Sequence, residues 1–314
     1  MAPDPVAPPA SESLDSQQPI LLMDIGNSAI KLARIENPAI TRRHLDNALA
    51  SAGDWFDDGC KNRLSFAERD TCVAIATGTS RWPALVAEQL CDWVDSEPAT
   101  NRTDSPKIDL RIASVREDTR LRLCNEVLCR FPMISAKPVQ RRDLPIRLQI
   151  ENPDSVGIDR LLAVIAAKRI FRGPAVVVDA GSAVTIDWLY DNSFCGGAIL
   201  AGLALQIETL SRGTSALPSI QITDAFDQPV GRNTRDAIRL GVLGGISAVI
   251  AGLHHRYVSA ADRPSSDVAS VPTPGEVPIL LTGGDGPLLG SQLRCDASYL
   301  RVLTAENAVL MGML

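Results

Sequence analysis

Residues 21–32 read LLMDIGNSAIKL: an apolar run meets an aspartate, turns at a glycine and a small polar pair, and is followed by a second apolar run. Residues 176–189, VVVDAGSAVTIDWL, repeat this arrangement 155 residues later. Each stretch predicts a β-hairpin, because two strand-like runs flank a short turn that contains glycine. One matching hairpin in each half of the chain indicates a molecule that repeats the same unit twice.

The two predicted hairpins are suited to binding phosphate. Glycine lets the backbone approach a ligand closely, and exposed amide and hydroxyl groups at a turn form a concave anion site. Asp24 and Asp179 end the first strand of each hairpin, and their charges would repel a phosphate unless metal ions lay between. The alternative is that each D-x-G is only a tight turn, since such short motifs often match by chance.

A third stretch, VPILLTGGDGPLL at 277–289, is an apolar strand that ends in Thr-Gly-Gly-Asp. Two adjacent glycines permit flat contact with a nucleoside, although Gly-Gly after a strand is usually a strand-to-helix turn. Elsewhere, strand-like runs alternate with helical patterns, which predicts an α/β architecture. The expected elements are a strand at 72–78 before a helix at 82–94, a strand at 108–114 before a helix at 117–130, and helices at 158–171 and 234–257.

The composition is typical of a soluble protein large enough for two domains, with 314 residues, 45% of them hydrophobic and 22% charged. The net charge of −6 and the pI near 5.2 disfavour nucleic acid and an anionic membrane as partners. Apolar runs fall short of the roughly 18 residues that a membrane span requires, so none is expected. Seven cysteines without a CxxC pair suit reduced thiols in a cytoplasm and argue against zinc.

Three segments rich in proline and small polar residues are expected to lie outside the folded core. Residues 1–18 carry acid but no base and predict a disordered tail rather than a targeting signal. Residues 95–106 and 261–278 predict surface loops.

Further stretches accompany the hairpins in a fixed order: ENPDSVGIDRLLAVIAA at 151–167, GGAILAGLALQIETLSRGTSALP at 196–218, and GRNT at 231–234. Together these motifs resemble the type III pantothenate kinases over essentially residues 20–314. That family is a branch of the actin-like ATPase and sugar-kinase superfamily, and the first motif also looks like that of its Bvg accessory factor relatives.

The resemblance implies an α/β fold of two similar actin-like (ribonuclease H-like) lobes with a nucleotide cleft between them. The lobes would be 19–172 and 173–314, with the last helix able to pack back on the first lobe. It also implies a cytoplasmic homodimer that binds ATP, Mg²⁺, pantothenate and a monovalent cation, K⁺ or NH₄⁺. The activity implied is ATP-dependent phosphorylation of pantothenate to 4'-phosphopantothenate, the first step of coenzyme A biosynthesis.

Carried over position by position, the resemblance also implies the site residues. Asp159 would be the general base that accepts the proton of the substrate hydroxyl, Asp24 would act with Mg-ATP, and Asp179 would bind the monovalent cation. The residues implied to contact ATP are Asp24, Ile25, Gly26, Asn27, Ser28, Ala29, Ile30, Lys31 and Ser182. The residues implied to form the pantothenate site are Gly157, Ile158, Asp159, Arg160, Thr234 and the residue at position 150, Ile150.

Plainer interpretations stand beside these roles. Asp159 could be an acid that the helix dipole favours in a first turn, and Lys31 could be a surface lysine rather than a phosphate ligand. Arg160 could pair with the pantothenate carboxylate through its planar fork, or it could be a solvated or bridging side chain.

The chain also departs from the family pattern. Ile150 stands where the family commonly has a tyrosine that contacts pantothenate, and Ala201 replaces the usual proline of a Pro-Gly pair. Serines replace threonines at positions 28 and 182 but keep the hydroxyl. Ile150 keeps open a kinase of the same fold for another small hydroxylated substrate, and the accessory-factor relatives keep open a nucleotide-binding regulator without catalysis.

Overall fold

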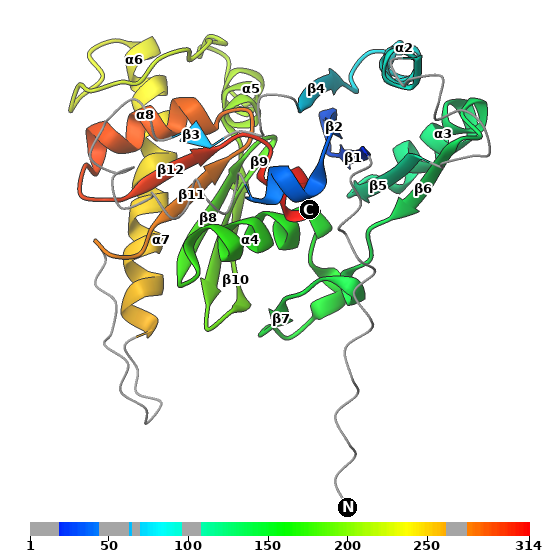
Figure 1. Ribbon diagram of the computed structural model, residues 1–314. Helices are drawn as coiled ribbons and strands as arrows, with labels where there is room; N and C mark the ends of the chain where they lie inside the picture. Colours follow the sequence, from blue (N-terminus) through cyan, green and yellow to red (C-terminus); the bar gives the residue numbers. More distant parts are fainter. Residues whose placement is uncertain (1–18, 44–62, 65–69, 96–107, 262–274) are drawn as a thin grey trace, which may run out of the picture.

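The computed structural model describes residues 19–43, 63–64, 70–95, 108–261 and 275–314 of the chain. Its strands form two separate sheets, and helices cover the faces of both (Figure 1). The expected tail at 1–18 lies outside the described residues, as do most of the expected loops at 95–106 and 261–278.

The first sheet has five strands in the order β4-β2-β1-β5-β6. The first predicted hairpin forms its centre, because β1 pairs antiparallel with β2, and β2 pairs antiparallel with β4. On the other side of β1, β5 and then β6 add in parallel. The strands are β1 (Ile20–Ile25), β2 (Ala29–Ile35), β4 (Thr71–Ala76), β5 (Ile108–Ser114) and β6 (Ile134–Pro138).

The second sheet repeats this order around the second hairpin. Its core is β10-β9-β8-β11-β12, in which β8, β9 and β10 are antiparallel neighbours and β11 and β12 add in parallel. These strands are β8 (Ala175–Ala180), β9 (Ala183–Tyr190), β10 (Ser193–Ala201), β11 (Ile279–Thr282) and β12 (Val302–Ala305). The shared strand order confirms the predicted α/β fold of two similar lobes.

Two short strands from the first half of the sequence join the edges of the second sheet. They are β3 (Arg63–Leu64), which pairs with β12, and β7 (Arg147–Leu148), which pairs with β10. The sheets therefore do not divide the chain at a single point, and the boundary after residue 172 stays a prediction.

Helices pack on the outer face of the first sheet and bury the β1 side chains that point to that face, which are those of Leu21, Met23 and Ile25. Leu21 and Met23 pack in one cluster with Val86 and Leu90 of α2 and Leu123 of α3. This alternation follows from the two-residue repeat of a strand. The helical segments here are α2 (Trp82–Asp95), α3 (Glu117–Glu126) and η3 (Leu128–Arg130), and the short turn η4 (Arg141–Asp143) follows β6.

The two lobes share a core built around α4 (Ile158–Phe171), which follows the short turn η5 (Pro153–Ser155). Its cluster joins Ile20 and Leu22 of β1 with Val177 of β8, so side chains from both sheets pack on one helix. The last helix, α9 (Ala308–Gly312), lies against α4, since a Cβ at Gly312 would fall 2.1 Å from the carbonyl oxygen of Leu162.

The opposite face of the second sheet carries a second set of helices. Val176, Val178 and Ile186 point to that face and pack with Ile246 and Ile250. The elements are α5 (Leu203–Gly213), α6 (Thr234–Arg239), the π-helix η6 (Leu240–Gly244), α7 (Gly245–Ala261) and α8 (Gly286–Asp296). The helices α4 and α6 thus pack on opposite faces of the second sheet.

Among the described residues, the continuous stretch Thr234–Ala261 is long and apolar enough, by length and composition, to cross a membrane. A core helix passes the same test. Ile238, Val242, Ile246 and Ile250 of this stretch are buried against the second sheet, as in a core helix of a folded domain.

Candidate active site between the two hairpins

The turns of the two hairpins touch each other. The hydroxyl oxygens of Ser28 and Ser182 lie 2.5 Å apart, although the residues are 154 positions apart in the sequence. Within the turns, the amide of Gly26 donates to the carbonyl of Ala29, and the amide of Gly181 donates to that of Ala183, each at 3.0 Å. Both serines are exposed, so the meeting point is open to a ligand.

The carboxylates that end β1 and β8 belong to one electrostatic cluster with Lys31 and Asp159. Asp24 is 5% exposed and lies directly across the strand pair from Lys31. Burial raises the pKa of Asp24 to about 7; Lys31 opposes this rise, and Asp179 and Asp159 add to it. Burial likewise raises the pKa of Asp179, again against Lys31 and with Asp159. The structure therefore brings the predicted phosphate, metal and base residues together.

The surroundings of Asp24 and Asp179 suit a bound cation. Buried carboxylates with raised pKa values gain from a nearby positive charge, because it offsets their desolvation and their mutual repulsion. Among the described residues, no three His, Cys, Asp or Glu side chains group closely enough to hold a metal alone. Mg²⁺ is usually bound through one or two carboxylates together with phosphates and water.

The Thr-Gly-Gly-Asp loop after β11 packs directly on the second hairpin. Gly283 has φ of +90°, and a Cβ there would lie 2.3 Å from the carbonyl oxygen of Ala180 and 2.5 Å from Oδ1 of Asp179. The amide of Asp285 donates to the same Ala180 carbonyl at 3.0 Å. Glycine is thus required here, both for the backbone conformation and to leave space beside the Asp179 carboxylate.

Asp159 is held at the start of α4. Gly157 is the N-cap of this helix, and the Asp159 side chain folds back so closely that a Cβ at Gly157 would lie 2.3 Å from its Oδ1. The same Oδ1 accepts a hydrogen bond of 2.8 Å from the amide of Arg160. Asp159 is half-buried, whereas the neighbouring Ile158 is buried in the core that both lobes share.

Arg160 is a bridging side chain, one of the alternatives that the sequence left open, and its partner is a residue that the sequence did not identify. Its Nε donates to Asp187 of β9 at 3.0 Å, and its Nη2 also contacts that carboxylate. Asp187 is 1% exposed, so this is a buried ion pair. The signal in the sequence is an acid inside the apolar run VTIDWL, but its partner lies 27 positions earlier and only the fold reveals it.

The two remaining predicted substrate residues lie in different places. Ile150 is half-buried and packs against the core around α4, near Gly196, which has φ of +86°. Thr234 is the exposed first residue of α6, whose N-cap Asn233 accepts a hydrogen bond from the amide of Asp236. Thr234 and Asp159 therefore begin helices that pack on opposite faces of the second sheet.

Comparison with known proteins identifies the family of the chain. The family model described as type III pantothenate kinase matches residues 86–256. A type III pantothenate kinase from Rhodopirellula baltica is 34% identical over 293 residues, which cover 88% of this chain and 92% of that protein. The chain belongs to the type III pantothenate kinase family.

Other type III pantothenate kinases match over shorter stretches. The protein from Synechococcus elongatus is 29% identical over 73% of this chain and 90% of its own length, and that from Gluconobacter oxydans is 34% identical over 53% and 56%. A solved Baf family protein from Campylobacter jejuni superposes with a TM-score of 0.48 at 18% identity, covering 94% of this chain and 95% of that one. The family assignment rests on the sequence matches.

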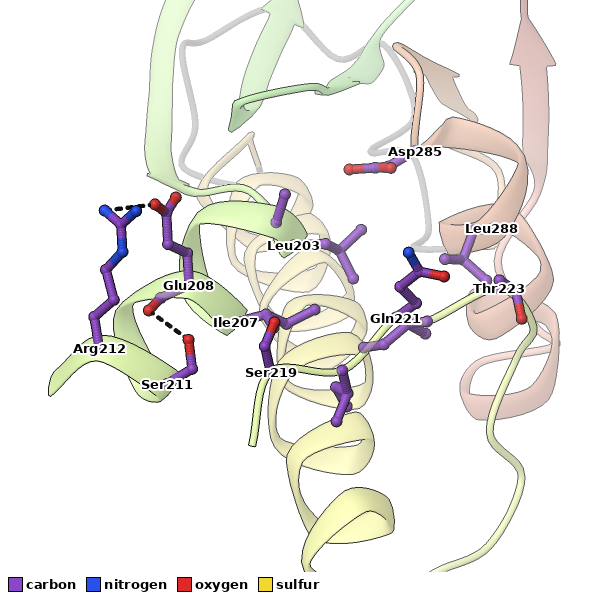
Figure 2. Close-up of a pocket in the computed structure, with 13 residues that line it drawn as sticks. Leu203, Ile207, Glu208, Ser211, Arg212, Ser219, Gln221, Thr223, Asp285 and Leu288 are labelled. Atoms are coloured by element: carbon purple, nitrogen blue, oxygen red, sulfur yellow. Dashed lines mark hydrogen bonds and ion pairs between the residues drawn. The ribbon is translucent and has the colours of Figure 1, made fainter. Parts of the chain in front are cut away.

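This pantothenate kinase family member also has a cavity of about 550 Å³ beside the second hairpin (Figure 2). The amide of Gly202, just before α5, donates to the carbonyl of Ser182 at 3.0 Å, so the cavity begins next to the turn of the second hairpin. Asp285 and Leu203 stand at that end, and the Glu208–Arg212 ion pair lies at another side. The lining residues come from α5, from 219–223 and from the loop and first turn of α8.

Proposed function

We propose that the cluster of Asp24, Asp179 and Asp159 is the active site of an ATP-dependent kinase that converts pantothenate to 4'-phosphopantothenate, the first step of coenzyme A biosynthesis. The observation that carries this is the contact between Ser28 and Ser182, which joins two phosphate-type turns beside three acids. Membership of the pantothenate kinase family supplies the reaction.

ATP would bind across both lobes. The hydroxyls of Ser28 and Ser182 lie at the point where the hairpins meet, and exposed hydroxyl groups at glycine-containing turns can bind phosphate. The cavity beside the second hairpin would take the adenosine, since it has apolar walls from Leu203, Ile207 and Leu288 and a polar end at Asp285. Asp285, the last residue of the Thr-Gly-Gly-Asp loop, stands at one edge of this cavity (Figure 2).

The cations would belong at the two buried carboxylates. Asp24 would hold Mg²⁺ together with the phosphates of ATP, and Asp179 would bind K⁺ or NH₄⁺. When bound, these ions supply positive charge to the oxygens of a loose phosphoryl-transfer transition state. Lys31 adds a fixed positive charge across from Asp24.

Asp159 would accept the proton of the pantothenate hydroxyl. It is half-buried at the start of α4 and oriented through the Arg160 amide, so its second carboxylate oxygen is available to a substrate. A positioned base contributes a factor of roughly 100 to 10,000 to the rate. The remaining catalysis would come from positioning and from charge stabilisation by the two turns.

The working unit would be a cytoplasmic homodimer. Thr234, which the family resemblance assigns to the pantothenate site, belongs to a helix on the opposite side of the second sheet from Asp159. A second copy of the chain is the simplest source of a Thr234 side chain at that site.

The decisive test is an assay of ADP release from the purified chain with ATP, Mg²⁺ and K⁺, with and without pantothenate. We expect pantothenate-dependent ADP release that falls when K⁺ is replaced by Na⁺. Asp159→Asn should lower kcat roughly 100- to 10,000-fold with little change in ATP affinity. Glu117→Gln, which removes an exposed acid from the first turn of α3, should leave kcat unchanged.

Failure of the wild-type chain to release ADP with pantothenate would reject the proposal. Ile150 favours one second candidate, a kinase of the same architecture for another small alcohol, because isoleucine lacks the hydroxyl of the usual tyrosine. ADP release with another hydroxylated acid, but not with pantothenate, would support that candidate. Full complementation of a pantothenate kinase-deficient strain by Asp159→Asn would instead indicate a regulator without catalysis.

A further inference from the structure

The guanidinium of Arg160 is fixed from two directions. Nε lies 3.0 and 3.2 Å from the two carboxylate oxygens of Asp187, and Nη2 contacts the same carboxylate. Its Cζ lies 5.4 Å from the centre of the Phe194 ring, within the range of a cation–π contact. Nη1 makes no hydrogen bond with the residues that the structure describes, so one edge of the fork remains for a ligand.

Asp187 owes its position to an irregularity in the neighbouring strand. The register of β10 on β9 shifts between Phe194 and Gly197, and Gly197 then lies directly opposite Asp187. A Cβ on Gly197 would fall 2.5 Å from Oδ1 of Asp187 and 2.3 Å from the carbonyl oxygen of Ile186. The carboxylate therefore occupies the space that the missing side chain leaves, and the bulge also places Phe194 beside Arg160.

Burying this ion pair costs free energy, because the Asp187 carboxylate and the Arg160 guanidinium lose their contact with water. Burial raises the pKa of Asp187 to about 6, and hydrogen bonding and charge from Arg160 oppose the rise. A buried ion pair is weak support for stability, because apolar residues of similar volume often stabilise as well or better. A role in the site accounts for the pair, since Arg160 directly follows Asp159 and its amide holds the Asp159 carboxylate.

We propose that Asp187, seated opposite Gly197, is a positioning residue that fixes the Arg160 guanidinium so that its open Nη1 edge pairs with the carboxylate of the substrate. This rests on the proposed function, because it deepens the same pantothenate site. The recognition is specific to an anionic end: a carboxylate accepts from a planar, oriented guanidinium, whereas a neutral amide gains much less.

The first test compares steady-state kinetics of Asp187→Asn with wild type. With an active fold, the expected result is a KM for pantothenate raised about 10- to 100-fold, which corresponds to the loss of one oriented charged hydrogen bond. The KM for ATP should change less than about twofold, and kcat less than about tenfold. The KM for pantetheine, in which an amide replaces the carboxylate, should stay within about twofold. If Asp187 had only a structural role, its loss would not raise the KM for pantothenate while sparing the KM for ATP, the KM for pantetheine and kcat.

Two controls accompany this variant. Asp191→Asn removes an exposed acid that pairs with Arg147 at 3.3 Å just beyond β9, and it should change none of the constants. Gly197→Ala keeps both charges but crowds Asp187, so it should raise the KM for pantothenate in the same direction as Asp187→Asn.

Removing an acid from a buried arginine can unfold a chain, so a second comparison uses Arg160→Gln with and without Asp187→Asn. With the guanidinium gone, loss of Asp187 should change the KM for pantothenate by less than about twofold. A further large rise in the double variant would overturn the proposal. An unchanged KM for pantothenate in a folded Asp187→Asn variant would also overturn the proposal. Equal rises in the KM values for pantothenate, pantetheine and ATP would overturn it as well. A wild-type chain inactive on pantothenate would reject the proposed function as well, whereas an active one isolates the failure to Asp187.

Discussion

Among single residues, Asp24 shows most clearly a conflict between stability and the proposed function, because it is an acid in a buried position. It is almost fully buried, and its nearest balancing charge is Lys31 across the strand pair, while Asp179 and Asp159 oppose its ionisation. A side chain optimised only for stability here would be neutral. The proposed binding of a cation and phosphates would account for the acid, because active sites often depart from the most stable choice.

The first prediction concerns the pH dependence of stability without ligands. The folded pKa of Asp24, about 7, lies above the ordinary aspartate pKa of 3.8, so its contribution to stability is fully present below about pH 4 and is lost as the pH rises through 7. In EDTA and without ATP, Asp24→Asn should therefore be more stable than wild type at pH 8, by up to about 4 kcal/mol, and not at pH 4.

Thermal unfolding at several pH values measures this difference. The control is Asp109→Asn, which removes a half-exposed acid of the same sheet that faces Lys137 at 3.5 Å. Its unfolding profile should run parallel to that of wild type. Parallel profiles for Asp24→Asn and wild type would contradict the expected burial of an ionised Asp24.

At the scale of elements, the second hairpin is held in place by glycine contacts. Gly202 precedes α5, and Gly283 follows β11; each brings its backbone so close to the turn that a Cβ would collide with it. The first hairpin has a different support, because the amide of Thr77 donates to the carbonyl of Ser28 at 2.9 Å. The turns therefore meet as parts of a rigid arrangement, which phosphate binding in a fixed geometry requires.

The second prediction tests this packing with Gly202→Ala. The added Cβ would lie 2.1 Å from the carbonyl oxygen of Gly181, so the hairpin or α5 must move. We expect a loss of about 1–3 kcal/mol in the free energy of unfolding, as for other overpacked sites. ATP affinity should fall as well, because the moved carbonyl belongs to the phosphate turn.

Gly252→Ala is the matched control. Gly252 is an exposed residue within α7, and a Cβ there would meet nothing within 4 Å. Alanine should stabilise this helix by about 0.5–1 kcal/mol and leave ATP binding unchanged. Chemical denaturation and titration with a fluorescent ATP analogue measure both effects. Equal ATP affinity in the two variants would show that the turn tolerates displacement.

Elements with a local pattern could be predicted, and those that depend on distant partners could not. The D-x-G repeats predicted both hairpins, and the apolar run at 158–171 predicted α4 at the same bounds. The two-residue strands β3 and β7 carry no periodic signal and form only because the edges of the second sheet accept them. Likewise Asp187 could be noticed as an acid in an apolar strand, but its pairing with Arg160 depends on the packing of α4 on β9.

At the scale of the whole molecule, the shared core links the lobes to the site. The helix that fills this core, α4, begins at the candidate base and packs against strands of both sheets. The hairpin turns from the same two sheets meet beside it. Any change in how the lobes pack on α4 would therefore change the distance between the two hairpin turns and Asp159, so the packing of the lobes sets the geometry of the candidate site.

The last prediction concerns assembly, because one chain leaves Thr234 on the far side of the second sheet from Asp159. If each site combines Asp159 of one copy with Thr234 of another, Asp159→Asn and Thr234→Arg should each be nearly inactive as homodimers. Mixing them under conditions of subunit exchange should restore about a quarter of wild-type kcat, since about half of the dimers are mixed and each has one intact site. Mixing wild type with Asp159→Asn gives the control for exchange. A mixture of the two variants that stays inactive, while tagged subunits demonstrably exchange, would place Thr234 outside a shared site.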